Sequence, residues 1–180
     1  MKHQIKRRKF LQRSLTATAG LAAFPHVVPA HVLGGKGKTA PSDKIVMGSI
    51  GVGGMGTGHV KSFIGYQDVH YAAVCDVNGK HRDNAKQIID ERYGNKDCAA
   101  YNDFRELLAR EDIDAIVIAT PEHWHTLIGM EAARQGKDMY YEKPLSRYFR
   151  ECQAIREAVN RYGVIFQHGT QQRSDERFRF

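Results

Sequence analysis

Three glycines placed directly after a β-branched run constrain the fold of this chain more than any other feature. The run Lys44–Ile50 (KIVMGSI) predicts a strand, and Gly51–Gly56 (GVGGMG) follows it with the pattern G-x-G-x-x-G. A helix is expected next, and a second apolar run, Val69–Asp76 (VHYAAVCD), ends on an acidic side chain twenty residues after the last glycine. This order of strand, glycine turn, helix and acid-terminated strand indicates a dinucleotide-binding βαβ unit.

Each part of the pattern has a physical task when a pyrophosphate binds. Gly51 permits the tight turn, Gly53 lets the pyrophosphate approach the backbone, and Gly56 lets helix and strand pack closely. The helix N-terminus adds free N–H groups and a partial positive charge, and Asp76 can accept hydrogen bonds from both ribose hydroxyls. A glycine turn that holds no phosphate is the alternative interpretation.

Asp76 also bears on the choice between NAD and NADP. A 2′-phosphate would stand beside its carboxylate, and at about 4 Å with an effective dielectric constant of about 20 the repulsion is ~4 kcal/mol. This energy corresponds to roughly a thousandfold weaker binding. Although Lys80 or Arg82 would reduce the repulsion, we expect NAD as the cofactor, with NADP less favoured.

Strand and helix patterns alternate along the rest of the chain. Further strands are predicted over Cys98–Tyr101, Ala115–Thr120, Asp138–Glu142 and Val164–His168, and helices over Lys80–Tyr93, Asp103–Arg110, Pro121–Gln135 and from Ser146 or Arg147 to Tyr162. The continuous apolar run Ala115–Thr120 (AIVIAT) is typical of a strand covered on both faces. The alternation predicts an α/β fold with a doubly wound parallel sheet, the Rossmann fold.

The net charge of +7 belongs to the N-terminal segment. Residues 1–30 hold six basic and no acidic residues, which leaves 21 basic and 20 acidic residues in the rest of the chain. We therefore expect no nucleic-acid partner. No apolar run reaches the ~18 residues that a membrane-spanning helix needs.

Residues 1–30 have the layout of an export signal. A cationic stretch, Met1–Arg13, precedes a short apolar stretch, Leu15–Phe24, and a small-residue site, Val28–Ala30. The run RRKFLQ at 7–12 resembles the twin-arginine motif, although Lys6 and Gln12 depart from it. We expect the twin-arginine export machinery as a partner and a periplasmic or cell-envelope location. A surface helix or a mitochondrial presequence is the alternative.

Metal binding is not expected from this sequence. Cys75, Cys98 and Cys152 are widely spaced, and a Cys75–Cys98 bridge stays open as a possibility. His123 and His125 stand two apart on a predicted helix and therefore do not face one another.

Two further loops follow strands at the same predicted edge of the sheet, where ligands bind in open parallel sheets. These are Ala119–His125 (ATPEHWH) and Glu142–Pro144 (EKP). Together with the glycine loop and Asp76, they resemble the Gfo/Idh/MocA oxidoreductases, from about Lys44 to Arg173.

The resemblance implies a role for each matching residue. The pyrophosphate would be held by Gly51, Gly53, Gly54, Met55 and Gly56, the adenosine ribose by Asp76, and the nicotinamide half by Thr120, Pro121, His125, Glu142, Lys143 and Pro144. Lys143 would be catalytic, because an ammonium beside an alcohol stabilises a developing alkoxide and can relay a proton. A surface lysine before a turn proline is the alternative. Trp124 is a candidate wall of the cofactor or substrate cleft, with simple packing as its alternative. Arg173 is a candidate on the substrate side, with a surface arginine as its alternative.

The family also carries a second α/β domain, which shapes the substrate pocket and the oligomer interface and which nothing in this sequence matches. The expected organisation is a signal peptide at 1–30, a linker at 31–42, an NAD(P)-binding Rossmann domain at 43–170, and at 171–180 the start of a crossover to a missing C-terminal domain. We expect little turnover from this chain alone and a homo-oligomer only with the missing domain.

The expected function is an NAD(P)-dependent oxidoreductase that transfers hydride between the cofactor and a hydroxyl or ketone of a sugar, polyol or glycoside. Two alternatives remain open at this point. One is an NAD-dependent glycosidase or lyase that oxidises its substrate transiently. The other is a non-catalytic nucleotide-binding module.

Overall fold

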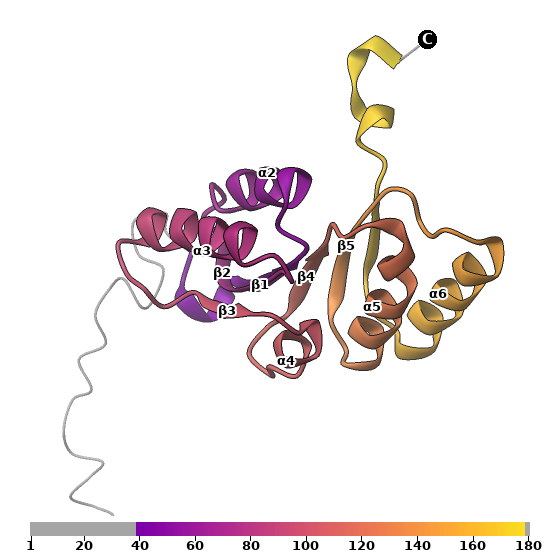
Figure 1. The fold of residues 1–180 in the computed structure, drawn as a ribbon, viewed down its shortest axis with the longest axis horizontal. Helices are drawn as coiled ribbons and strands as arrows, with labels where there is room; N and C mark the ends of the chain where they lie inside the picture. The colour runs from indigo at the N-terminus through magenta and orange to yellow at the C-terminus, as the bar shows by residue number, and fades with distance from the viewer. Residues whose placement is uncertain (1–38, 179–180) are drawn as a thin grey trace, which may run out of the picture. The chain divides into compact units, whose positions relative to one another are not determined.

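The computed structural model describes residues 39–178. The expected signal peptide and most of the expected linker lie outside the described residues. Within them, six parallel strands form one sheet: β1 Ile45–Ile50, β2 Val69–Cys75, β3 Ala99–Tyr101, β4 Ala115–Ile118, β5 Asp138–Glu142 and β6 Phe166–Gly169. The strand order β3-β2-β1-β4-β5-β6 confirms the predicted doubly wound sheet (Figure 1). The strand order reverses between β1 and β4, because β2 and β3 follow on one side of β1 whereas β4, β5 and β6 follow on the other. Such a switch point opens a crevice at the carboxyl ends of the strands.

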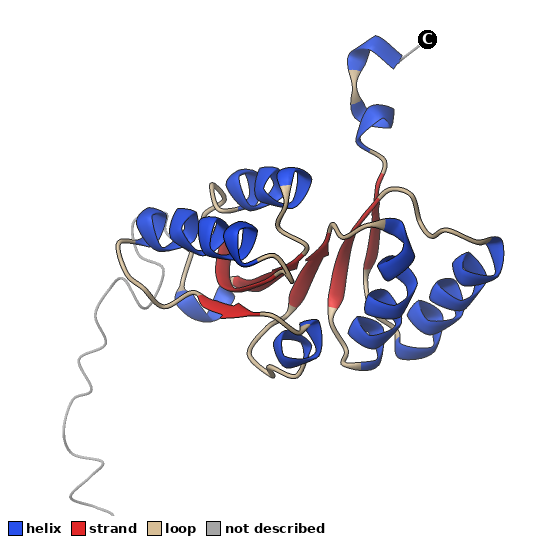
Figure 2. Cartoon of the chain, viewed as in Figure 1, coloured by secondary structure: helices blue, strands red, loops and turns tan. Residues whose placement is uncertain are grey.

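Helices cover both faces of the sheet (Figure 2). Their bounds are α2 Gly54–Phe63, α3 Gly79–Tyr93, α4 Phe104–Leu108, α5 Glu122–Arg134 and α6 Phe149–Tyr162, and the short 3-10 helices are η1 Pro41–Asp43, η2 Gln171–Ser174 and η3 Glu176–Phe178. One buried cluster lies under α2 and α3, and the other lies under α4, α5 and α6. Strand β4 serves both, because Ile116 and Ile118 face one cluster while Val117 faces the other.

The ends of several elements depend on local hydrogen bonds. The side chain of Asp103 accepts from the backbone N–H of Arg105 and caps α4. Helix α6 begins at Phe149, later than predicted, because the N–H of Tyr148 donates to the carboxylate of Glu151. Strand β6 also begins later than predicted, since the N–H of Ile165 bonds to the side chain of Asp138.

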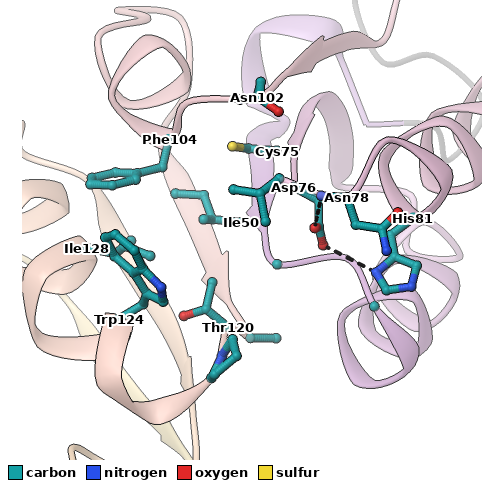
Figure 3. Close-up of a pocket in the computed structure, with 15 residues that line it drawn as sticks. Ile50, Cys75, Asp76, Asn78, His81, Asn102, Phe104, Thr120, Trp124 and Ile128 are labelled. Atoms are coloured by element: carbon teal, nitrogen blue, oxygen red, sulfur yellow. Dashed lines mark hydrogen bonds and ion pairs between the residues drawn. The ribbon is translucent and has the colours of Figure 1, made fainter.

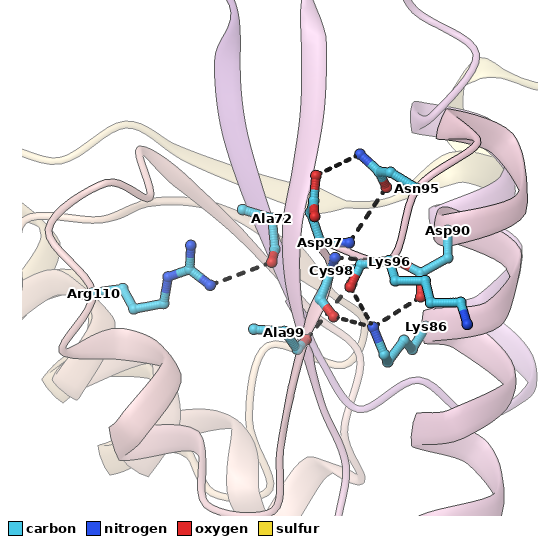
Figure 4. A network of polar contacts seen from close by, with 9 residues as sticks. All are labelled: Ala72, Lys86, Asp90, Asn95, Lys96, Asp97, Cys98, Ala99 and Arg110. Carbon is cyan, nitrogen blue, oxygen red and sulfur yellow. Dashed lines mark hydrogen bonds and ion pairs between the residues drawn. The ribbon is translucent and has the colours of Figure 1, made fainter.

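A polar network joins the end of α3 to the start of β3 (Figure 4). The ammonium of Lys86 donates to the carboxylate of Asp90 at 2.8 Å and to the carbonyls of Lys96 and Cys98 at 3.3 and 2.5 Å. The N–H of Cys98 donates to Asp90 at 3.2 Å. These bonds fix the start of the edge strand β3, which pairs with β2.

The cysteines carry free thiols, so the Cys75–Cys98 bridge left open above is not formed. Burial raises the pKa of both Cys75 and Cys98 to about 12. Neither thiol therefore suits nucleophilic chemistry. Within residues 39–178, none of the helices combines the length and the apolar character needed to span a bilayer.

Candidate functional site

The glycine turn after β1 is packed tightly on its inner side. Gly51 has a φ of 81°, and a Cβ atom there would lie 2.7 Å from the backbone nitrogen of Thr120. A Cβ on Gly56 would lie 1.9 Å from the carbonyl oxygen of Gly51. Both positions therefore require glycine, the first for its conformation as well. The start of α2 and the glycine turn therefore pack directly against the loop after β4.

The outer side of the same turn is open. A Cβ on Gly53 would meet only the ring of His81, at 3.5 Å, and one on Gly54 would meet nothing within 4 Å in the described part of the chain. Gly53 is the N-cap of α2 and supplies no side-chain hydrogen bond. The N–H groups of the first turn, which includes the half-exposed Met55, can therefore meet an anion. The turn fits the pyrophosphate that the sequence predicts.

Asp76 follows β2 and is held at both carboxylate oxygens. Oδ2 accepts from the N–H of Val52 and Oδ1 from the N–H of Asn78, each at 2.8 Å. The imidazole Nδ1 of His81 lies 3.8 Å from Oδ2 (Figure 3). Each carboxylate oxygen retains a lone pair for a ligand hydroxyl.

A pocket of about 500 Å³ extends from the glycine turn past Asp76. One wall is apolar and is made by Ile50, Phe104, Trp124 and Ile128 (Figure 3). The rings of Phe104 and Trp124 meet edge to face with centroids 6.4 Å apart. The structure thus places Trp124 in the wall of the pocket that Asp76 also lines.

Thr120 and Pro121 line the same pocket. The hydroxyl oxygen of Thr120 is buried and has no hydrogen-bond partner among residues 39–178. Buried polar groups in proteins are almost always paired. An orphaned hydroxyl in the pocket wall therefore points to a ligand that supplies the partner.

His125 does not line this pocket. Its ring is fully buried beneath the two loops, and its nitrogens lie 2.7 Å from the carbonyl oxygens of Thr120 and Pro144. The family resemblance implies that His125 lines the cofactor. In the structure, its ring instead joins the loop after β4 to the loop after β5 through those two carbonyls.

Glu142 and Lys143 stand at the carboxyl end of β5. Glu142 is buried, and its carboxylate contacts the Nε2 of His59 at 2.8 Å and accepts from the N–H of Lys143 at 2.9 Å. The side chain of Lys143 is exposed, and the Lys143–Pro144 peptide is cis. In the sheet register Ile50 pairs with Ile118, which pairs with Tyr141 in turn. The glycine turn and the E-K-P loop therefore leave the same edge of the sheet.

The remaining candidate, Arg173, is not brought to the pocket. It is exposed on η2, which extends away from the sheet together with η3 (Figure 1). Sequence reasoning missed His59, His81 and Phe104. For His59 a signal existed: it stands three residues after Gly56, so both lie on the same face of α2. Within residues 39–178, no three His, Cys, Asp or Glu side chains are grouped closely enough to hold a metal ion.

Comparisons with known proteins identify relatives of this chain. Residues 45–170 match the Gfo/Idh/MocA oxidoreductase family, described as having an NAD-binding Rossmann fold. A glycosyl hydrolase family 109 protein of Shewanella baltica and an alpha-N-acetylgalactosaminidase of Shewanella oneidensis are each 34% identical over 173 residues. Each alignment covers 88% of this chain and 38% of the relative, so the chain spans well under half the length of these curated relatives.

Solved structures give the same fold. The myo-inositol 2-dehydrogenase of Lactobacillus plantarum is 26% identical, with a TM-score of 0.66 over 74% of this chain and 38% of that one. An NAD-binding protein of Listeria innocua is 28% identical, with a TM-score of 0.64 over 75% of this chain and 38% of that one. The scyllo-inositol dehydrogenase of Lactobacillus casei, solved with bound NAD(H) and scyllo-inositol, has a TM-score of 0.67 at 24% identity over 74% of this chain and 38% of that one.

Proposed function

The chain belongs to the Gfo/Idh/MocA oxidoreductase family, whose Rossmann fold binds NAD, and from this premise we propose that it forms the cofactor-binding part of an enzyme that transfers hydride to or from a carbohydrate hydroxyl or ketone. The occurrence of three features in one pocket carries the proposal. The pocket contains an uncapped helix N-terminus, a fixed carboxylate and the orphaned hydroxyl of Thr120, which together match a dinucleotide.

The residues divide between the two halves of the cofactor. The turn at Gly53 and Gly54 would hold the pyrophosphate, and Asp76 the adenosine ribose. Phe104 and Trp124 offer aromatic surface in the pocket wall against which an adenine ring could pack. When bound, the nicotinamide would supply the hydride acceptor or donor.

The surroundings of Asp76 favour NAD over NADP. The guanidinium of Arg82 donates to the carbonyl of Asp76 at 3.3 Å and to the side chain of Asn102 at 3.2 Å. Both bonds engage the guanidinium away from the carboxylate of Asp76. A 2′-phosphate would therefore be repelled by that carboxylate.

Lys143 is the catalytic candidate in this chain. It follows the carboxyl end of β5, its side chain is exposed at that edge, and its backbone is fixed by Glu142. We infer that its ammonium meets the substrate oxygen. A bound cofactor would supply the hydride acceptor for the carbinol carbon. The ammonium of Lys143 would stabilise the alkoxide that develops on the substrate and would pass the hydroxyl proton on to water.

A glycosidase is the second candidate, because the curated relatives at 34% identity bear glycosidase names. The same site would then oxidise a sugar transiently and return the hydride to the sugar after the glycosidic bond is cleaved. Export by the twin-arginine route and a periplasmic location stay part of the proposal, on the evidence of residues 1–30 alone.

Titration of the purified chain with NADH and NADPH tests the cofactor site, and absence of NADH binding would overturn both candidates. The reaction is tested in a protein that also carries the segment found in the longer relatives. Lasting NADH from a sugar or polyol supports the oxidoreductase, whereas a cleaved glycoside without net NADH supports the glycosidase. Lys143→Ala should lower either turnover at least a hundredfold, and Lys61→Ala on the exposed side of α2 is the matched control.

A further inference from the structure

The carboxylate of Glu142 is enclosed by three elements. It ends β5, its Oε1 contacts the Nε2 of His59 on α2 at 2.8 Å, and its Oε2 accepts from the N–H of Lys143. A Cβ on Gly169 would lie 3.2 Å from Oε1, so the backbone of β6 closes the third side. The side chain of Glu142 is 4% exposed. A carboxylate this buried requires its hydrogen-bond partners, and His59 provides one of them.

The ring of His59 is held in the orientation that this contact needs. It stacks on Phe63 of the same helix, with centroids 6.1 Å apart and an interplanar angle of 29°. It also meets Tyr140 of β5 edge to face, with centroids 5.0 Å apart. Its side chain is 16% exposed, so packing restricts its rotation and aims Nε2 at Glu142.

We propose that His59 is a positioning residue for the nicotinamide end of the cofactor site. It holds the carboxylate of Glu142 and, through it, the backbone from which the side chain of Lys143 projects. Helix α2 begins at the glycine turn, so this contact ties the E-K-P loop to the element that would bind the pyrophosphate. The inference rests on the proposed function and adds a residue to which the sequence analysis gave no role.

Binding of ADP and of NADH can be compared to distinguish a positioning role of His59 from a general contribution to the fold. ADP would contact the glycine turn and the Asp76 pocket, whereas NADH would reach Glu142 and Lys143 as well. A positioning role therefore predicts that His59→Ala weakens NADH binding about tenfold and leaves ADP binding unchanged. His59→Gln, whose amide can donate to the same carboxylate, should restore most of the NADH affinity.

The experiment titrates the whole chain with both ligands and follows amide hydrogen exchange at Lys143. In His59→Ala the amide of Lys143 should exchange faster, because its acceptor is no longer held. In a Glu142→Ala background, His59→Ala should cause little further loss of NADH affinity, because both changes act through one carboxylate. The matched control is His70→Ala. His70 lies on β2, outside the lining of the pocket, and its ring stacks on Tyr93 of α3.

Each outcome is decisive. If the unaltered chain binds neither ligand, the proposed function fails together with this inference. If the unaltered chain binds both, and His59→Ala either binds NADH as tightly or loses ADP and NADH equally, the positioning role is wrong and the proposed function stands. Selective loss of NADH affinity with rescue by His59→Gln supports it.

Discussion

The carboxylate Oδ2 of Asp76 accepts a hydrogen bond from the backbone N–H of Val52 at 2.8 Å, which ties the end of β2 to the glycine turn. The second oxygen accepts from the N–H of Asn78. The carboxylate is thus fixed in direction without a ligand, at a set position relative to the α2 N-terminus. A dinucleotide would meet a site that is already arranged, which lowers the entropic cost of binding.

Asp76→Asn should weaken NADH binding about tenfold and reduce the preference for NADH over NADPH from roughly a thousandfold to less than about tenfold. The amide keeps one acceptor oxygen but loses the negative charge that repels a 2′-phosphate. Fluorescence titration with both cofactors measures the change. Asp83→Asn, an exposed change on α3, is the matched control. NADPH binding to the unaltered chain as tight as NADH binding would refute the assignment of NAD.

Trp124 is the sole tryptophan of the sequence and its side chain stands in the pocket wall. Its fluorescence should therefore change when ADP alone binds, because adenine would pack against its ring. Nicotinamide mononucleotide should leave the emission unchanged. The opposite pattern would assign Trp124 to the substrate cleft, the other position that the sequence left open. Trp124→Ala should weaken ADP binding about tenfold.

Two glycines of the same turn should respond to alanine in opposite ways. Gly56→Ala would force a Cβ to within 1.9 Å of a carbonyl oxygen, so the chain should lose its cooperative thermal transition. Gly53→Ala meets only ordinary contacts with His81, so the chain should keep its Tm within about 2 °C and yet lose cofactor affinity. Calorimetry and NADH titration separate the two effects. Full affinity in Gly53→Ala would mean that no phosphate approaches this turn.

The fold could be predicted from sequence because its signals are local. Runs such as Ala115–Ile118 are apolar at every position, and Gly94 and Gly163 end their helices in the left-handed conformation. The glycine turn and the E-K-P loop could be placed at one sheet edge from topology alone. The contact between His59 and Glu142 could not, since it joins residues 83 apart whose meeting depends on helix packing.

The orientation of the side chains on α5 also could not be predicted from the sequence. A position three or four residues after Pro121 carries no sign in the sequence of whether its side chain faces the pocket or the core. Trp124 and His125 are neighbours, yet one lines the pocket and the other is buried beneath two loops. Only the packing of α5 on the sheet distinguishes them.

Acid should destabilise the chain through two histidines before its carboxylates titrate. Burial lowers the pKa of His70 and of His168 below the usual 6.5, more than nearby carboxylates raise it. Below pH 6.5 the unfolded state therefore binds more protons than the native state, and the free energy of unfolding falls as the pH falls. The paired carboxylates, such as Asp112 and Glu131, have lowered pKa values and lose their contribution only in more acidic solution.

The measurement is Tm between pH 7.5 and 5.5 for the unaltered chain and for the double variant His70→Gln with His168→Gln. Over this range the unaltered chain should lose about 2–4 °C more than the double variant, because glutamine does not titrate. Each single variant should remove part of the slope, since the two histidines lie on different strands, β2 and β6. Parallel curves for the unaltered chain and the double variant would show that neither imidazole is kept neutral by burial.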